Sequence, residues 1–262
     1  MEKIEITLGI STIFGRYDNA LAVANGARNL FDNVVVVVQG AESNCEESEG
    51  NLSIIFSDTL GLSKSRNLLL KHGKSDWLWI NDDDVSFKPG HVEVVRNNIR
   101  LHGQRAKLFA GRIGCSDCTG LYKKYRFRWM TPLLFAQVSS IEMIVNRNWC
   151  LEKSIGFDHR FGLGTDLPTS EEPIFASDII RSGGLIRDIG EVIVDHPCRS
   201  PRLTTRQSWN SEKLAMARGS VAARIGTWRG AAFLLFGFVR SITNGSLNNA
   251  MIMFRAYVKY DK

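Results

Sequence analysis

Short apolar runs separated by helical patterns are the feature that most constrains the fold of this chain. Strands are predicted at residues 4–10 (IEITLGI), 34–38 (VVVVV), 52–56 and 77–80, with helices at 17–31 and 63–72. A continuous run such as VVVVV lacks polar alternation, which is typical of strands buried on both faces. The order therefore predicts an α/β fold with a largely parallel sheet and a ligand crevice at the carboxyl ends of its strands.

The rest of the chain extends this layer and then changes character. Further helices are expected at 91–102 and 175–181, and further strands at 107–111, 137–145 and 185–194. We predict one catalytic domain over 1–200, which divides at about residue 110. A basic, amphipathic helical tail would occupy 201–262.

Charge is distributed unevenly along the 262 residues. The formal charge is +6, but residues 201–262 carry ten Lys and Arg against two acidic residues, which leaves −2 for residues 1–200. A mildly acidic domain without a nucleic-acid motif argues against nucleic-acid binding. The basic, aromatic tail either lies in a membrane interface or packs on the domain or a partner subunit. Its longest apolar run, 231–239, is too short to span a membrane.

The predicted strand at Trp77–Ile80 runs into three consecutive aspartates in WLWINDDDVSF (77–87). At the carboxyl end of a buried strand, Asp82 and Asp84 would project to one side and Asp83 to the other. Carboxylates suit hard cations such as Mg²⁺ or Mn²⁺, which would offset their mutual repulsion. The alternative is a solvated acidic turn or the cap of the following helix.

Four segments in this order resemble glycosyltransferase family 2: LGISTIFGR (8–16), GLSKSRNLLL (61–70), WLWINDDDV, and GFDHRFGLG (156–164) with SEEPIFASDIIRSGG (170–184). The resemblance covers roughly residues 4–200 and implies a nucleotide-binding half at 1–110 and an acceptor half at 111–200. It implies a GT-A fold, Rossmann-like in its nucleotide-binding part, and inverting, metal-dependent transfer from a nucleotide sugar. WLWINDDDV would then be the family's DxD motif.

The resemblance also implies roles for individual residues. Asp83 would face the donor ribose and Asp84 the metal, with Asp82 close by. Other nucleotide contacts are implied for the following residues: Thr12 near the base, Arg16 in the same loop, Arg66 and Asn67. The family usually has an acidic residue after its second strand to receive the base. This chain has Gln39 there. Its amide would still hydrogen-bond the base, but the identity of the nucleotide is less defined.

Two acids and a histidine complete the candidate site. Glu172 matches the family's catalytic base, which takes the proton of the attacking hydroxyl, and Glu171 would support it. Alternatively, both acids only complement the dipole of the helix that follows. His196 in VDHP matches a histidine that completes the metal or diphosphate site in many GT-A enzymes, although a lone histidine is often a packing residue. Arg199 and Arg202 contact the diphosphate or are solvated.

The five cysteines are odd in number and spread along the chain, and no secretory signal precedes them, so we expect reduced thiols and a cytoplasmic location. Cys115 and Cys118 have zinc-knuckle spacing without a second pair. A structural zinc site would need two further ligands nearby in space, so two reduced cysteines in a loop are expected instead.

These features predict a hexosyltransferase-type enzyme that moves a sugar, from UDP by preference, to a hydroxyl of a glycan or lipid-linked acceptor. Surface polysaccharide synthesis is the expected setting, with the tail as a peripheral anchor on the inner face of the cell membrane. The cofactor would be Mn²⁺ or Mg²⁺. The alternatives are a nucleotidyltransferase of similar fold and a non-catalytic nucleotide-sugar-binding protein. The acceptor, the linkage and the oligomeric state are not determined by these patterns.

Overall fold

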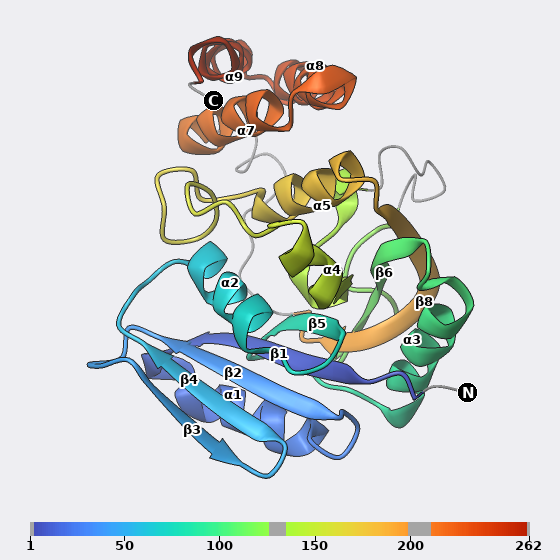
Figure 1. Cartoon of the computed structure of the whole chain (residues 1–262). Coiled ribbons are helices and arrows are strands. Elements are labelled where there is room, and N and C mark those ends of the chain that lie inside the picture. The colour runs from blue at the N-terminus through green and yellow to red at the C-terminus, as the bar shows by residue number, and fades with distance from the viewer. Residues whose placement is uncertain (1–2, 126–134, 199–210, 261–262) are drawn as a thin grey trace.

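The computed structural model describes residues 3–125, 135–198 and 211–260, and its central element is one eight-stranded sheet (Figure 1). The strands are β1 (Ile6–Ile13), β2 (Asn33–Gln39), β3 (Cys45–Glu49), β4 (Leu52–Ser57), β5 (Trp77–Asp82), β6 (Ala106–Cys115), β7 (Met143–Asn146) and β8 (Leu185–His196). They lie in the order β3-β4-β2-β1-β5-β7-β6-β8. β4, β2, β1 and β5 are parallel, as are β6 and β8, whereas β3 and β7 pair antiparallel with their neighbours. The predicted, mostly parallel α/β sheet is confirmed.

Helices cover both faces of the sheet. The helices of this part are α1 (Tyr17–Ala27), α2 (Leu62–His72), α3 (Pro89–His102), α4 (Arg147–Glu152) and α5 (Glu171–Arg181), with short 3₁₀ turns η1 (Phe14–Arg16) and η3 (Ser140–Glu142). The VVVVV run divides between the two sides of the sheet. Val34, Val36 and Val38 belong to the buried cluster that contains residues of α1 and α3, and Val35 and Val37 belong to the cluster that contains residues of α2 and α5. Both faces of β2 are therefore dry, which explains its uninterrupted valines.

Some predicted elements differ from the observed ones. The strand expected at 137–145 is shorter, because η3 occupies its middle and only β7 pairs in the sheet. β3 was not predicted, since all five residues of CEESE are exposed and the strand is defined only by its pairing with β4. The helix expected at 17–31 ends at Ala27, and α5 begins at Glu171, four residues before the predicted start.

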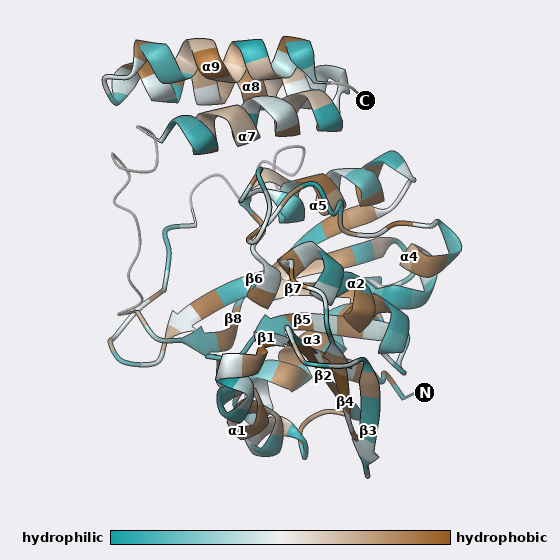
Figure 2. Ribbon diagram, turned by 90° about the vertical axis from the view of Figure 1, so that its left-hand side faces the viewer, coloured by the Kyte–Doolittle hydropathy of each residue, from teal (hydrophilic) through white to brown (hydrophobic). Residues whose placement is uncertain are grey.

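Three further helices follow: α7 (Glu212–Ile225), α8 (Thr227–Thr243) and α9 (Leu247–Lys259). α7 lies over α5, and α8 and α9 lie beyond it, away from the sheet (Figures 1 and 2). Val221 and Ile225 of α7 are buried in the same cluster as Phe175 of α5. Arg224 is bonded to Asp178 of α5 and to Asp158, with Nε to Oδ2 of Asp158 at 2.8 Å. Among the described residues, no helix combines the length and the hydropathy required to cross a bilayer.

Candidate active site

The carboxyl ends of β1 and β5 are adjacent because the two strands pair in parallel, with Ser11 opposite Asp82. This register places the turn after β1 beside the aspartates after β5. The Thr12 hydroxyl donates a hydrogen bond to Oδ2 of Asp83. A guanidinium nitrogen of Arg16 lies 2.5 Å from Oδ1 of Asp83 and 3.5 Å from Oδ2 of Asp84. The guanidinium of Arg16 therefore bridges Asp83 and Asp84.

The prediction that Asp82 and Asp84 project to one side and Asp83 to the other is wrong. β5 ends at Asp82, and Asp83 and Asp84 form a turn. Asp83 and Asp84 consequently share Arg16, while Asp82 points to Arg66, 3.9 Å away. Strand alternation does not extend into a turn, so the sequence period could not predict this division.

His196, at the end of β8, lies against Asp84. Its Nε2 is 3.1 Å from Oδ1 of Asp84, and its Nδ1 is 2.7 Å from the Pro197 carbonyl oxygen. Burial by itself would lower the pKa of His196, but hydrogen bonding and attraction to Asp84 outweigh it and raise this pKa. The bond to His196 likewise lowers the pKa of Asp84 against the effect of burial.

The Asp84–His196 pair fits a divalent cation. A carbonyl oxygen only accepts hydrogen bonds, so Nδ1 of His196 carries the proton, and in the neutral ring Nε2 is left as a metal ligand. Oδ1 of Asp84 is buried, and when the ring is neutral it receives no hydrogen bond from the described residues, although Nε2 of His196 lies 3.1 Å away. One imidazole nitrogen and one carboxylate oxygen thus face each other, and this pair of ligands suits Mn²⁺ better than Mg²⁺.

A second polar cluster surrounds Arg66 of α2. Its NH1 lies 2.9 Å from Oε1 of Glu171 and 3.2 Å from Oε1 of Glu172. The side chains of Arg66 and Glu171 are 2% and 5% exposed, whereas that of Glu172 is 17% exposed. Glu171 is therefore the buried partner of the arginine, and Glu172 is the glutamate that reaches the solvent side of the site.

The close approach of several carboxylates raises pKa values in this half of the site. Burial and repulsion from Glu172 raise the pKa of Glu171, although Arg66 opposes them. Desolvation and the neighbouring carboxylates Asp84 and Glu172 raise the pKa of Asp82 to about 6, again against Arg66. Such raised values are common where carboxylates are gathered for acid–base chemistry or metal binding.

The loop 156–164 is fastened to α2 and packs beside the glutamates. The Asn67 amide accepts from the Phe157 N–H at 2.7 Å and donates to the Phe157 carbonyl at 2.8 Å, and it also bonds the His159 ring. Gly162 has φ +105°, and a Cβ there would lie 3.2 Å from the carboxyl carbon of Glu171. A glycine at this position allows the loop to pass close to that carboxylate.

Three expected nucleotide contacts are not supported by these positions. Arg66 is buried and surrounded by carboxylates, and the Asn67 amide is used by the loop 156–164. Gln39 is also buried; its amide oxygen accepts from the Gly61 N–H at 2.8 Å, and its nitrogen donates to the Thr12 carbonyl. The polar groups of these three side chains are used in bonds within the protein, which hold the elements of the site together. Arg199 and Arg202 lie outside the described residues.

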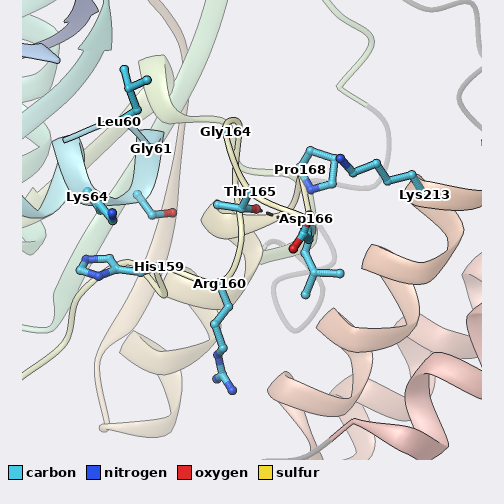
Figure 3. A pocket seen from close by; sticks show the side chains of 12 residues that line it. Leu60, Gly61, Lys64, His159, Arg160, Gly164, Thr165, Asp166, Pro168 and Lys213 are labelled. Atoms are coloured by element: carbon cyan, nitrogen blue, oxygen red, sulfur yellow. Dashed lines mark hydrogen bonds between the residues drawn. The ribbon is translucent and has the colours of Figure 1, made fainter. Parts of the chain in front are cut away.

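Two features were not found from the sequence. Ile13, the last residue of β1, and Phe14, which follows it, are 47% and 55% exposed and precede Arg16 in the same turn. The sequence pattern that could have indicated them is an apolar pair at the end of a predicted buried strand. Second, a pocket of about 830 Å³ lies between the start of α2, the loop around Arg160 and Asp166, and Lys213 of α7 (Figure 3). Asp82, Asp83 and Asp84 do not line this pocket.

Comparison with known proteins agrees with this geometry. Residues 31–154 match the family model Glycosyl transferase family 2. S. aureus TarS 1–349 has a similar structure at 12% sequence identity, with a TM-score of 0.59 over 98% of this chain and 92% of that one. Its complex with UDP-GlcNAc gives 11% identity, a TM-score of 0.59 and the same coverage, and its complex with UDP gives 12% and 0.54 over 98% and 88%. No curated protein matches the sequence. Over residues 31–154 the chain is similar to glycosyltransferase family 2, and as a whole it shares the GT-A fold of these structures.

Proposed function

We propose that the protein transfers a sugar from a nucleoside diphosphate sugar to an acceptor hydroxyl with inversion at the anomeric carbon. The observation that supports this most directly is the side-by-side arrangement of two carboxylate clusters. One contains Asp83, Asp84, Arg16 and His196, and the other contains Glu171 and Glu172 around Arg66. Direct displacement needs a group that stabilises the leaving diphosphate and a base for the attacking hydroxyl, and each cluster supplies one of these.

The first cluster is the proposed diphosphate side. Asp84 and His196 would hold Mn²⁺ or Mg²⁺, which neutralises charge on the diphosphate when bound. Arg16, whose side chain is 45% exposed, adds a fixed positive charge at the same edge. Asp83, bonded by Thr12 and Arg16, is positioned to accept from a ribose hydroxyl.

Glu172 is the proposed base. It would take the proton of the acceptor hydroxyl as the oxygen attacks the anomeric carbon. A guanidinium nitrogen of Arg66 lies 3.2 Å from Oε1 of Glu172. The same nitrogen donates a hydrogen bond to the more buried Glu171. Glu171 is therefore a positioning residue, because it fixes Arg66 and through it the orientation of Glu172.

The donor is proposed to be a UDP-sugar, in line with the UDP and UDP-GlcNAc complexes of S. aureus TarS. The exposed ring of Phe14, at the end of β1, offers a flat surface for the base. The acceptor is proposed to be a glycan or a lipid-linked saccharide of a surface polysaccharide. Part of the loop expected to select it, 115–132, lies outside the described residues.

The tail is proposed to bring the enzyme to a membrane surface as a peripheral protein. Large apolar side chains are exposed along both α8 and α9: Trp228, Leu235, Phe236, Val239 and Ile242, then Leu247, Met251, Phe254 and Val258. Arginines and lysines lie on the same helices, which favours an anionic lipid surface.

The reaction is tested by nucleoside diphosphate release from a panel of nucleotide sugars with Mn²⁺ or Mg²⁺. Asp84→Asn and Glu172→Gln should each lower turnover by roughly 100-fold or more, since general-base and charge-neutralising groups contribute on this order. Only Asp84→Asn should also shift the metal concentration needed for half-maximal activity.

The matched control is Glu152→Gln, an exposed glutamate of α4, which should keep full activity. Full activity of either active-site variant would remove that residue from the mechanism. Release of pyrophosphate from a sugar phosphate and a nucleoside triphosphate would identify a nucleotidyltransferase instead.

A further inference from the structure

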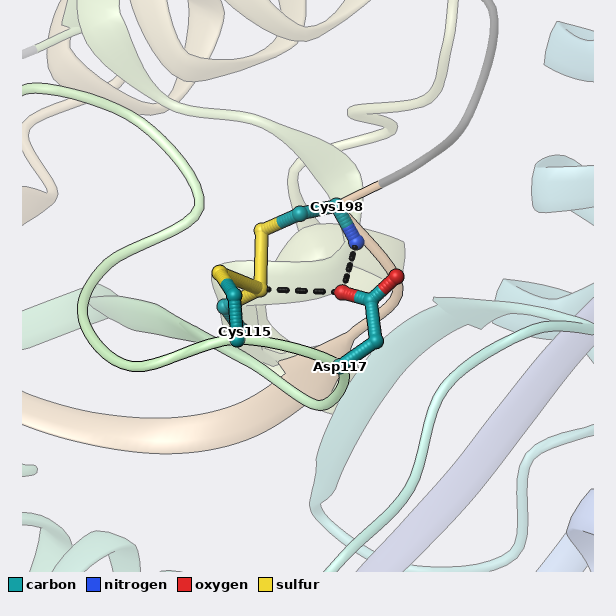
Figure 4. Close-up of side chains that lie close together, drawn as sticks. Cys115, Asp117 and Cys198 are labelled. Carbon is teal, nitrogen blue, oxygen red and sulfur yellow. Dashed lines mark hydrogen bonds between the residues drawn. A yellow bond between two sulfur atoms is a disulfide. The ribbon is translucent and has the colours of Figure 1, made fainter.

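Three cysteine sulfurs and one carboxylate converge at a place that the proposed reaction does not use. Cys115 is the last residue of β6, Asp117 and Cys118 follow in the next turn, and Cys198 lies two residues after β8. Their candidate ligand atoms all lie within 4.8 Å of one another. Figure 4 shows Cys115, Asp117 and Cys198 pointing toward a common centre.

The backbone holds these segments together independently of the sulfurs. β6 and β8 run parallel to the point where Cys115 is opposite His196. The Ser116 N–H donates to the His196 carbonyl at 3.1 Å, and the Cys198 N–H donates to Oδ1 of Asp117 at 2.7 Å. The sheet therefore delivers Cys198 to the Cys115–Cys118 turn, although 83 residues separate Cys115 from Cys198.

A disulfide does not account for this arrangement. The sulfur of Cys115 is placed against the sulfurs of both Cys118 and Cys198. A cysteine sulfur forms a disulfide with one partner only, so either bond leaves the third thiol beside it. Asp117 adds a carboxylate, 3.0 Å from the Cys115 sulfur. A shared cation satisfies all four groups at once.

We propose that Cys115, Asp117, Cys118 and Cys198 bind a structural zinc ion. Thiolates are soft ligands that select zinc over the Mg²⁺ or Mn²⁺ proposed for Asp84. Four protein ligands complete a tetrahedral site and leave no open position for a substrate, which is typical of structural zinc. Binding would displace one proton from each of the three thiols. The sequence suggested only the Cys115–Cys118 pair, and the structure adds the two missing ligands.

The zinc site would stabilise one wall of the active site. It joins the turn after β6 to the end of β8, two residues from His196. The Tyr122 ring, in the segment that follows the turn, contacts the His196 ring with centroids 4.5 Å apart. The zinc site would thus act on His196 as a positioning device. This consequence rests on the proposed function, but the metal site itself does not.

The test is the metal and thiol content of the full-length protein, purified without added chelator. We expect about one zinc ion per chain by elemental analysis. Five titratable thiols are expected after denaturation with chelator but without reductant, matching the five cysteines of the sequence. Protein with no zinc and two thiols missing would contain a disulfide and would overturn the proposal.

Variants locate the ion. Cys118→Ser and Cys198→Ser should each lose most of the zinc, while Cys45→Ser, at an exposed and unpaired cysteine, should keep it. Zinc retained by both of the first two variants would contradict the assignment. If these variants do not fold, Co²⁺ exchanged into the natural protein decides, because thiolate ligation gives an intense charge-transfer absorption that carboxylate or imidazole ligation lacks.

Asp84→Asn separates this proposal from the proposed reaction. It should lower nucleoside diphosphate release by roughly 100-fold or more and still carry one zinc ion per chain. Loss of zinc in this variant would mean that the ion occupies the Asp84–His196 site instead. A protein that contains zinc but releases no diphosphate from any donor would contradict the proposed function and leave the zinc site supported.

Discussion

At the scale of single residues, burial distinguishes groups that the sequence presents as equivalent. Glu171 and Glu172 are adjacent acids at a helix start, and both bind Arg66, but only Glu172 retains appreciable exposure. Removing Arg66 would leave buried carboxylates without a partner, which costs several kcal/mol in comparable cases. We therefore expect Arg66 to stabilise the fold and to orient the proposed base Glu172.

Phe14 provides a prediction at this scale. If its exposed ring stacks on the nucleotide base, Phe14→Ala should raise the KM for the donor by about tenfold with little change in kcat, because base–aromatic stacking contributes roughly 1–3 kcal/mol. Steady-state kinetics of nucleoside diphosphate release would measure this. Leu101→Ala, at an exposed residue of α3, is the control. An unchanged donor KM in Phe14→Ala would exclude a stacking role.

At the scale of elements, ionic contacts join helices that the sequence cannot pair. Asp158 receives bonds from Arg160 and from Arg224 of α7, and Arg224 also binds Asp178 of α5. Burial alone would raise the pKa of Asp158, but the hydrogen bonds from Arg160 and Arg224 outweigh it and lower this pKa to about 2. Protonation of Asp158 therefore opposes the attachment of α7.

This linkage predicts a pH dependence. A depressed carboxyl pKa stabilises the fold above the unfolded value of ~3.9, and the stabilisation is lost as pH falls toward the folded value. The difference in unfolding free energy between the natural protein and Asp158→Asn should shrink by about 1 kcal/mol from about pH 6 to about pH 3. Urea unfolding at each pH measures it, with Glu152→Gln as the control. A gap that stays constant with pH would show that Asp158 is not held by these arginines.

At the scale of the whole molecule, the three C-terminal helices differ in what they contact. α7 packs on α5, and α8 and α9 lie beyond it with exposed apolar residues and basic charge (Figure 2). The sequence left packing and membrane binding as alternatives. The structure shows the packing of α7, and the outer faces of α8 and α9 remain as the proposed membrane contact.

This arrangement predicts that the full chain sediments with anionic vesicles and that Leu235→Asp/Phe236→Asp reduces binding at least several-fold. Two charges on the apolar face oppose its insertion into the interface. Leu101→Asp, equally exposed but on α3, should bind as the natural protein does. Equal sedimentation of all three, or a concentration-dependent dimer abolished by the same pair of changes, would contradict membrane binding by this face.

The sequence predicted the buried strands better than it predicted the contacts within the candidate site. Val34–Val38 and Trp77–Ile80 were predicted because burial on both faces leaves a continuous apolar run. β3 was not, since its exposed residues carry no such signal and only the β4 backbone defines it. The motif order located Asp82–Asp84, Glu172 and His196, but the engagement of Arg66, Asn67 and Gln39 in hydrogen bonds within the protein could not be read from spacing.

The sequence by itself determined the α/β layer, the resemblance to the family and the carboxylates that carry the proposed chemistry, because hydrophobic period and short motifs are local properties. Only the tertiary structure decided which groups meet. The parallel pairing of β6 and β8 brings Cys198 to Cys115 and places His196 within reach of Asp84. Such contacts join residues far apart in the chain, and they depend on sheet register and side-chain packing, which no local pattern encodes.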